Sequence, residues 1–344
     1  MANIKLYFQN IHYLKTKPSW LLSSVLNIAE FFYSIVINFK NALYDFKILS
    51  EKEVDANVIC VGNLTTGGVG KTPVVTTLAN KYQDCCIISR GYGAVISNKN
   101  PVIIKDREKI YFNDGTLCGD EIYQLAKNTP KTTTLIICSD RYKAAKLATE
   151  KYGIKTIILD DGFSNRKLKK DKTILLIDSK MRFGNGHLLP KGPLREPYSE
   201  IKRANEIILV NKNDNDIKSA ISWAKMFKKP LKICNMVPNR IYNIQTKANI
   251  IPSGDAIAFC AIGQPQQFYN YLNQFYNIKE TFSFEDHYKY TKYDINHLVE
   301  MAKKYNVTTL LTTQKDESKI INLIQNFKGF NFNVLELKNI IEEI

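Results

Sequence analysis

The chain opens with one long apolar run. From Pro18 to Phe39 it reads "PSWLLSSVLNIAEFFYSIVINF", and Glu30 is the only charged residue in it. At about 1.5 Å per residue, a helix over this run would reach across most of a ~30 Å hydrocarbon layer. A charge in its middle makes a full span costly. Three alternatives stay open: a helix at a membrane interface, a membrane span, and a helix packed on the protein. Flanking lysines and Trp20 are typical of the first.

A rhythm of short apolar runs follows a charged hinge, "KILSEKEVDAN". Each run is apolar on both faces and ends in polar residues, which is typical of buried parallel strands. Helical stretches lie between several of them, as from Lys71 to Tyr82 and from Arg141 to Tyr152. This alternation predicts an α/β sheet with crossover helices. The runs are "NVICVG", "CCIIS", "TTLIICSD", "KTIILDD", "TILLID" and "EIILVN".

A polar segment, "NKNDNDIKSAISWAKMFKK", separates this rhythm from a second one. Beyond it come the strand "AIAFCAIG", a helix near 264–275, the strand "ETFSF", a helix near 294–305 and the strand "VTTLLTT". We therefore predict three parts: an apolar membrane-associated helix in residues 1–48, a larger α/β domain in 49–225 and a smaller α/β domain in 226–344. A chain of 344 residues is long enough for two cores.

Charge narrows the class of partner only partly. Lys and Arg number 48 against 33 Asp and Glu, so an anionic partner is indicated: nucleic acid, an anionic membrane face or a phosphorylated substrate. The same excess can also be a solvated lysine-rich surface, and no nucleic-acid-binding motif accompanies it. The seven cysteines lie mostly in apolar runs without paired metal spacing, which is typical of buried thiols in a reducing compartment.

A glycine-rich stretch, "VGNLTTGGVGKTP", lies between the first predicted strand and the first predicted helix of the larger domain. That context is the one that a phosphate-binding loop needs, although Thr65 stands where the usual G-x-x-x-x-G-K-[ST] pattern has a glycine. Its glycines let the backbone wrap around phosphates, Lys71 can reach the β- and γ-oxygens, and the Thr72 hydroxyl can ligate Mg²⁺. The predicted nucleotide-binding residues are Thr65, Thr66, Gly67, Gly68, Val69, Gly70, Lys71 and Thr72.

Acidic residues follow the strand "TIILDD", which ends in Asp160 and Asp161. A parallel strand delivers these carboxylates to the same edge of the sheet as the loop, where such groups hold Mg²⁺ or its waters. Further on, the rigid segment "GHLLPKGPLREP" presents Arg195 and Glu196 side by side. The pair could neutralise phosphate and ligate metal, or it could be a surface ion pair.

One histidine of the smaller domain, His287, has the surroundings of a general base. It follows Asp286 just after a predicted strand, in "FSFEDHYKYT". A histidine oriented by a carboxylate has a suitable pKa to take the proton of an acceptor hydroxyl. A structural histidine is the alternative, and the residues alone leave both open.

The motifs taken in order resemble one family, the tetraacyldisaccharide 4'-kinases of lipid A biosynthesis. The resemblance runs from about residue 57 to 316, and the family also carries an N-terminal membrane-associated helix. A general phosphate-loop protein would share only the first motif. The motifs are "VGNLTTGGVGKTP", "ISRGYG", "GDEIYQLAK", "SDRYKAA", "ILDDGFSNRKLKKD", "GNGHLLPKGPLREP", "FCAIGQPQQF", "FEDHYKYT" and "LLTTQKD".

The resemblance implies a P-loop NTPase-like domain that transfers the γ-phosphoryl group of ATP to the 4'-hydroxyl of tetraacyldisaccharide 1-phosphate, giving lipid IVA. It implies ATP and Mg²⁺ as cofactors, no nucleic-acid partner, a location on the cytoplasmic face of the bacterial inner membrane, and a smaller domain that closes the active-site cleft. The resemblance assigns Lys71 and Thr72 to binding ATP and magnesium, and Asp160, Asp161 and Glu196 to the surroundings of the metal. It assigns Asp120 and His287 to the acid-histidine pair that takes the hydroxyl proton. Arg141 and Arg195 would stabilise phosphate charge, and Tyr92 lies in a motif near the site.

Three positions depart from the family pattern. Ser164 and Asn165 replace the glutamine and histidine of the usual "DDGFQH", and Gln314 stands where a glutamate is common. Any hydrogen bond from that usual glutamine to the nucleotide or the metal shell is therefore in doubt.

Two other classes compete with the kinase. A partitioning-type ATPase also carries "GGVGKT", but with a lysine directly before the paired glycines, where this chain has Thr66. A nucleic-acid-dependent NTPase would fit the net charge and would show salt-sensitive, sequence-independent DNA binding. Neither class predicts a lipid acceptor.

Overall fold

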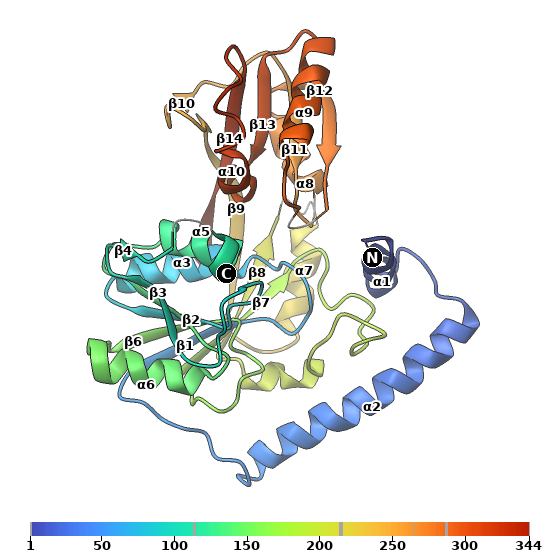
Figure 1. The fold of residues 1–344 in the computed structure, drawn as a ribbon. Helices are drawn as coiled ribbons and strands as arrows, with labels where there is room; N and C mark the ends of the chain where they lie inside the picture. The colour runs from blue at the N-terminus through green and yellow to red at the C-terminus, as the bar shows by residue number, and fades with distance from the viewer. Residues whose placement is uncertain (1, 113–114, 213–215, 264, 286–287, 344) are drawn as a thin grey trace. The chain divides into compact units, whose positions relative to one another are not determined.

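The computed structural model describes residues 2–343 apart from 113–114, 213–215, 264 and 286–287 (Figure 1). The predicted fold class is confirmed, since the protein is α/β with a mostly parallel sheet. Two compact units are present, Met1–Asn235 together with Ile340–Ile344, and Met236–Asn339. The domain limits predicted from the sequence, with a junction at 225/226, stay a prediction.

The first unit is built on strands that the apolar runs predicted. Their order is β9-β8-β7-β1-β6-β2-β5-β3-β4, and the strands from β8 to β5 pair in parallel. β3 and β4 form an antiparallel edge that the sequence did not predict. The bounds are β1 (Asn57–Gly62), β2 (Cys86–Ser89), β3 (Val102–Asp106), β4 (Lys109–Ile110), β5 (Thr134–Ile137), β6 (Thr156–Asp160), β7 (Lys172–Asp178), β8 (Glu206–Asn211) and β9 (Leu231–Asn243).

Crossover helices cover both faces of this sheet. α3 and α5 lie on one side and α6 on the other (Figure 1). Small side chains, Ala144, Ala145 and Ala148, let α6 pack closely on the apolar face of β1, β2 and β6. Asp140 caps α6 by accepting the amides of Tyr142 and Lys143. The helices are α3 (Lys71–Tyr82), α4 (Gly115–Cys118), α5 (Asp120–Asn128), α6 (Arg141–Tyr152), η1 (Tyr198–Arg203) and α7 (Ile217–Lys225).

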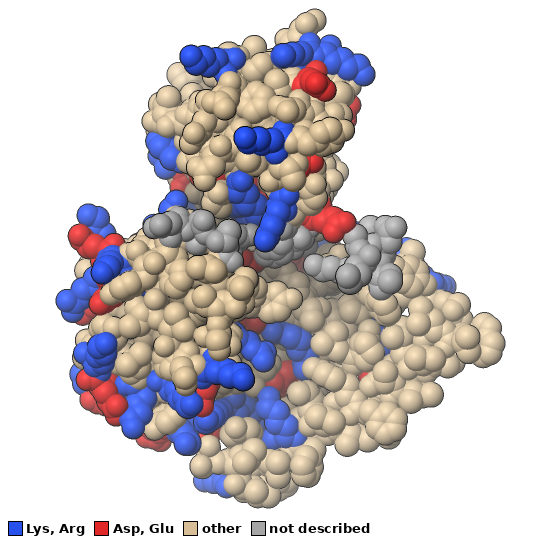
Figure 2. All heavy atoms as spheres, viewed as in Figure 1, with Lys and Arg blue, Asp and Glu red and all other residues tan. Residues whose placement is uncertain are grey.

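Two N-terminal helices precede the sheet, α1 (Ala2–His12) and α2 (Trp20–Asp45). α2 is the one helix of the described chain that is long and apolar enough to cross a membrane, judged by length and composition, and only 6% of its most apolar window is buried. Much of the surface over α2 carries neither acidic nor basic side chains (Figure 2). The helix is therefore not a core element.

The strands of the second unit follow the order β12-β11-β13-β14-β9. β11 pairs in parallel with β12 and β13, and β13 with β14. Apolar clusters fill both faces, one around Phe259 and Leu298 and another around Ala258 and Leu272. The remaining elements are β10 (Asn249–Ile250), β11 (Asp255–Cys260), β12 (Asn277–Ser283), β13 (Thr309–Thr313), β14 (Asn331–Glu343), α8 (Pro265–Leu272), α9 (Lys292–Lys304) and α10 (Gln314–Ile320).

Gly62, the last residue of β1, has no room for a side chain. A Cβ there would lie 2.6 Å from the Cβ of Phe163 and 2.9 Å from its backbone nitrogen. We expect Gly62→Ala to lower the free energy of unfolding by roughly 1–3 kcal/mol through overpacking, seen as a lower thermal midpoint. Gly68→Ala is the matched control, because a Cβ at Gly68 meets nothing within 4 Å. Equal midpoints for the two variants would contradict this reading.

Candidate active site

The glycine-rich loop connects β1 to α3 with the geometry of an anion site. Gly67 and Gly70 take left-handed backbone conformations, with φ of 105° and 97°, which favour glycine. Gly70 is the N-cap of α3, and Lys71 is the first residue of that helix. The free amides at a helix N-terminus and its dipole attract phosphate. The loop therefore offers backbone amides and the Lys71 ammonium in one place.

A second segment holds this loop in position. The amide of Arg195 donates to the carbonyl of Leu64 at 2.7 Å, and the amide of Thr66 donates to the carbonyl of Pro193 at 2.8 Å. On another side the Tyr13 hydroxyl donates to the carbonyl of Thr66 at 3.3 Å. Because these are main-chain contacts of the loop, its shape depends on a stretch more than a hundred residues later in the sequence.

Asp161 lies beside the loop because β6 pairs with β1, with Asp160 in register with Val61. Its carboxylate is 3.8 Å from the Lys71 ammonium, and Lys71 also donates to the side-chain oxygen of Asn63 at 3.3 Å. Asp161 has a φ of 54°, a left-handed conformation that aspartate tolerates better than most residues. The structure thus brings the two predicted features together at one sheet edge.

Arg195 binds Asp161 with both ends of its guanidinium, at 2.9 and 2.8 Å. The same guanidinium donates to the backbone and side-chain oxygens of Asn63. Burial raises the pKa of Asp161, but the Arg195 hydrogen bonds and the charge of Lys71 outweigh it and lower that pKa to about 2. Asp161 is therefore an anion at neutral pH, and Arg195 is fixed beside the loop.

Asp160 has a different environment. It accepts a hydrogen bond from the Ser89 hydroxyl at 2.9 Å, and burial raises its pKa above the ordinary value. The two adjacent carboxylates at this strand end are thus unequal. Unequal pKa values within a cluster of charged groups are common at functional sites.

Arg141, at the start of α6, is almost fully buried, with 4% of its surface exposed. One guanidinium nitrogen donates to the carbonyls of Cys138 and Ser139. Burial and the nearby charge of Arg90 lower the pKa of Arg141, while Asp161 and Asp160 raise it. The arginine is therefore near the carboxylate pair, and its predicted contact with phosphate stays a prediction.

The predicted metal ligands divide into two groups. Thr72 follows Lys71 in the first turn of α3, next to the strand end that carries Asp160 and Asp161, and these hard oxygen donors suit Mg²⁺ together with phosphate oxygens. Glu196 instead points its Oε2 at Asn41 and Arg203. Within the described part of the chain, no three acidic, histidine or cysteine residues are grouped for a metal ion. The metal role of Glu196 has no contact here in its favour.

The predicted acid-histidine pair lies largely outside the description. His287 is not among the described residues, and of Asp120 only the backbone is described, as the first residue of α5. The turn that carries Tyr92 approaches this point, since a Cβ on Gly119 would lie 3.1 Å from the Tyr92 carbonyl oxygen. The exposed Tyr92 motif and the start of α5 are therefore neighbours. The pairing of Asp120 with His287 stays a prediction.

The family departures at 164 and 165 have local roles. The Asn165 side chain accepts the amide of Leu168 at 3.3 Å, and the carbonyl of Ser164 accepts the Lys40 ammonium at 2.9 Å. Both residues therefore support the turn after β6, and neither of these two contacts involves the loop.

Sequence reasoning missed Lys212, which lies directly after β8. Its ammonium donates to the carbonyl of Gly68 in the loop and to Asp178 at 3.0 Å. It also missed Asn63, which precedes the loop pattern but joins Lys71 to Arg195. The one usable signal was position, since both residues follow strands whose ends meet at this sheet edge.

A loop of this shape, with its lysine at a helix N-terminus and a carboxylate on the adjacent strand, is built for nucleotide phosphates. Fold and site together define a phosphate-loop nucleotide-binding protein. The chain belongs to the tetraacyldisaccharide-1-P 4'-kinase family, whose model matches residues 22–343. The resemblance stated from the motifs is thereby confirmed.

Named relatives and a solved structure agree with this assignment. The tetraacyldisaccharide 4'-kinase of Halothermothrix orenii is 33% identical, covering 91% of this chain and 87% of the relative. The tetraacyldisaccharide 4'-kinase of Aquifex aeolicus is 35% identical, and the match covers 91% of this chain and 95% of that relative. A crystal structure of LpxK from Aquifex aeolicus in complex with ATP superposes with a TM-score of 0.73 at 32% identity, over 93% of this chain and 95% of that one.

The lowered pKa of Asp161 predicts how the stability of the folded protein changes with pH. Its pKa is about 2 against an ordinary 3.8, so the carboxylate stabilises the folded state fully above about pH 4 and loses that contribution as the pH falls towards 2. We expect Asp161→Asn to be less stable than the unsubstituted protein at pH 7, with a gap that shrinks below pH 4. Urea titrations at several pH values measure it. A gap of constant size would refute the pairing.

A substitution of Lys212 tests whether nucleotide binding depends on the contact between this lysine and the phosphate loop. Lys212→Met keeps the stem but removes the donor to Gly68, so we expect nucleotide affinity to fall by about 3- to 10-fold, measured by calorimetric titration with ATP. Lys225→Met, on the exposed end of α7, is the control and should bind as the unsubstituted protein does. Equal affinity in both variants would remove Lys212 from the site.

Proposed function

We propose that the chain is an ATP-dependent kinase that phosphorylates the 4'-hydroxyl of tetraacyldisaccharide 1-phosphate, forming lipid IVA in lipid A biosynthesis. The observation that carries this proposal is the family match over residues 22–343, joined to a phosphate loop that lies against the Asp161–Arg195 pair. ATP as the donor is supported by the Aquifex aeolicus structure, which was solved with ATP.

In the proposed reaction the 4'-oxygen forms a bond to the γ-phosphorus, and the bond from that phosphorus to the bridging oxygen breaks, so that ADP leaves. Positioning and charge stabilisation carry most catalysis of this kind. The amides of the loop and Lys71 hold the phosphates, and Arg195 brings a fixed positive charge beside them. The hydroxyl proton passes to the pair assigned by the resemblance, Asp120 and His287.

Magnesium completes the donor set in this proposal. Thr72 and the carboxylates of Asp160 and Asp161 are the residues that would hold it or its waters. When bound, the ion neutralises charge on the β- and γ-phosphates. Arg141 would add a second positive charge on the side of α6.

α2 fits a role at the membrane that holds the lipid acceptor. Several of its large apolar side chains are more than half exposed, while the charged Glu30 is turned to the protein. This arrangement favours an interfacial helix over a span or a packed core helix. We propose that the enzyme lies on the cytoplasmic face of the inner membrane, where ATP is available. The exposed side chains are Trp20, Leu21, Val25, Ile28, Phe31, Phe32, Val36 and Phe39.

Phosphoryl transfer tests the proposal directly. The purified chain is incubated with γ-labelled ATP, Mg²⁺ and tetraacyldisaccharide 1-phosphate in detergent, and the lipid is then separated by chromatography. We expect label in the lipid, and a loss of at least about 100-fold in Lys71→Met, because its charge faces the transferred group. Lys81→Met, at the other end of α3, is the control.

The outcomes separate the proposal from its rivals. Unlabelled lipid together with ATP hydrolysis that rises with vesicles would indicate a switch ATPase. Hydrolysis that rises with DNA would indicate a nucleic-acid-dependent enzyme.

A further inference from the structure

The face of α2 opposite its exposed apolar side chains makes polar contacts with the Arg195–Glu196 segment. Towards the middle of the helix, Glu30 accepts the amide of Leu188 at 2.8 Å and contacts the His187 ring at 3.1 Å. The Lys191 ammonium lies 3.8 Å from the same carboxylate. The single acid of the apolar run is therefore a fixed attachment to the loop that leads to Arg195.

Tyr33 contacts the Arg195–Glu196 segment directly. Its hydroxyl donates to the backbone carbonyl of Arg195 at 2.9 Å. The amide of the same arginine donates to Leu64 in the phosphate loop, and its guanidinium binds Asp161. Arg195 is thus held from the helix on one side and from the nucleotide site on the other.

Asn41 makes the second contact, with Glu196. Its amide donates to Oε2 of the fully buried Glu196 at 3.1 Å, and Arg203 donates to the same oxygen at 2.6 Å. The other oxygen, Oε1, is buried, and no hydrogen-bond partner for it is found in the described chain. Asn41 therefore supplies one of two hydrogen bonds that hold a buried carboxylate.

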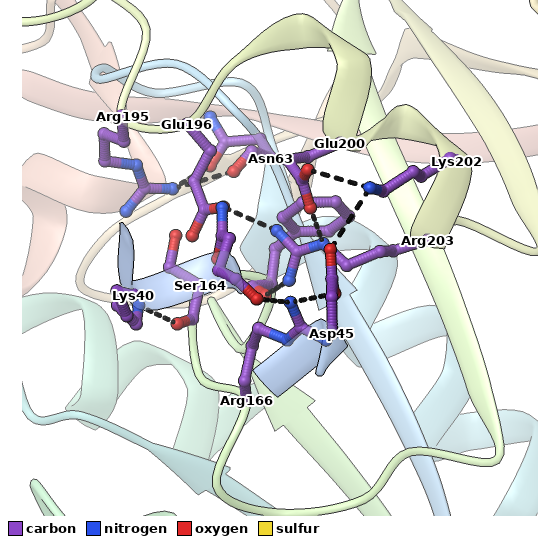
Figure 3. A network of polar contacts seen from close by, with 12 residues as sticks. Lys40, Asp45, Asn63, Ser164, Arg166, Arg195, Glu196, Glu200, Lys202 and Arg203 are labelled. Atoms are coloured by element: carbon purple, nitrogen blue, oxygen red, sulfur yellow. Dashed lines mark hydrogen bonds and ion pairs between the residues drawn. The ribbon is translucent and has the colours of Figure 1, made fainter. Parts of the chain in front are cut away.

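Further contacts tie the end of α2 to the turn after β6. Lys40 donates to the carbonyl of Ser164, and Arg166 donates to the carbonyl of Asn41 and the carboxylate of Asp45 (Figure 3). The ring of Tyr44 stacks under the Arg166 guanidinium at 5.0 Å. That turn begins at Asp161, so both partners of the Arg195–Asp161 pair are connected to this one helix.

We propose that Tyr33 and Asn41 are positioning residues for phosphoryl transfer: the polar face of α2 sets the place of Arg195 and Glu196, while its apolar face meets the lipid. The inference rests on the proposed function and deepens it, because it gives the helix a part in turnover besides attachment. A misplacement of about 1 Å in a reacting group can cost on the order of 100-fold in rate.

Two variants remove these contacts with little change of shape. Tyr33→Phe deletes only the hydroxyl, and Asn41→Leu deletes the amide at similar volume. Two controls lie on the same helix: Ser34→Ala, whose hydroxyl donates to the carbonyl of Phe31 within the helix, and Asn38→Leu, which is exposed and adds the same apolarity as Asn41→Leu. Each full-length variant is assayed with the acceptor in phosphatidylethanolamine–phosphatidylglycerol vesicles.

We expect kcat to fall by about 3- to 10-fold in Tyr33→Phe and by about 10- to 100-fold in Asn41→Leu, with KM for ATP within about 2-fold and vesicle co-sedimentation unchanged. The controls should keep their kcat. Amide exchange should quicken at Leu188 and Arg195 in Asn41→Leu and not in Asn38→Leu. If α2 only anchored the protein, the two substitutions would change vesicle binding and the KM for the acceptor, and would leave kcat and amide exchange unchanged.

Unchanged kcat and unchanged exchange in Tyr33→Phe and Asn41→Leu would overturn the inference. If the unsubstituted protein transferred no label, the proposed function would fail on its own, and amide exchange would still decide whether α2 positions the segment. Faster exchange at Arg195 in Asn41→Leu would support positioning in that case, and unchanged exchange would refute it.

Discussion

The pairing of Arg195 with Asp161 is the interaction on which the site depends. It joins three stretches that are far apart in the sequence: the loop after β1, the end of β6 and the segment before η1. Two parallel hydrogen bonds between a guanidinium and a carboxylate fix direction as well as distance. Because Lys71 shares the same carboxylate, the phosphate loop, the strand end and the arginine keep one relative arrangement.

The second constraint is the two-sided character of α2. Its large apolar residues are exposed, and its polar residues bond to the segment that carries Arg195 and Glu196. A helix that only anchored the protein would need the first face alone. Leaving a buried polar group without a hydrogen bond costs stability, so the contact between Asn41 and Glu196 is costly to lose. The exposed apolar face and the contacts to the segment beside the nucleotide site thereby belong to one structural element.

Much of this could be predicted from the sequence, because the signals are local. Apolar runs bounded by polar residues predicted the parallel strands, and a glycine-rich stretch between strand and helix predicted the loop at Lys71. Parallel topology then predicted that Asp160 and Asp161 would reach the same edge. The antiparallel edge of β3 and β4 was missed, since these strands are short and lack a long apolar run.

Contacts made by tertiary structure could not be predicted. Glu30 looked like a cost within an apolar run, because its partners Leu188 and His187 are more than 150 residues away. The metal role of Glu196 stays a prediction, and only the folded chain shows the contacts of its side chain with Asn41 and Arg203. Lys212 belongs to no motif that predicts a contact with the phosphate loop. Most of these contacts join residues that are far apart in the sequence, so the spacing of residues in one sequence does not predict them.

A double-mutant cycle on Tyr33 and Arg195 tests the central claim most directly. Transfer rates are compared for the unsubstituted protein, Tyr33→Phe, Arg195→Lys and the double variant. If Tyr33 acts by placing Arg195, its substitution should cost little once the two-pronged guanidinium is gone, so the two losses should be strongly non-additive. Equal losses from Tyr33→Phe in both backgrounds would contradict the account.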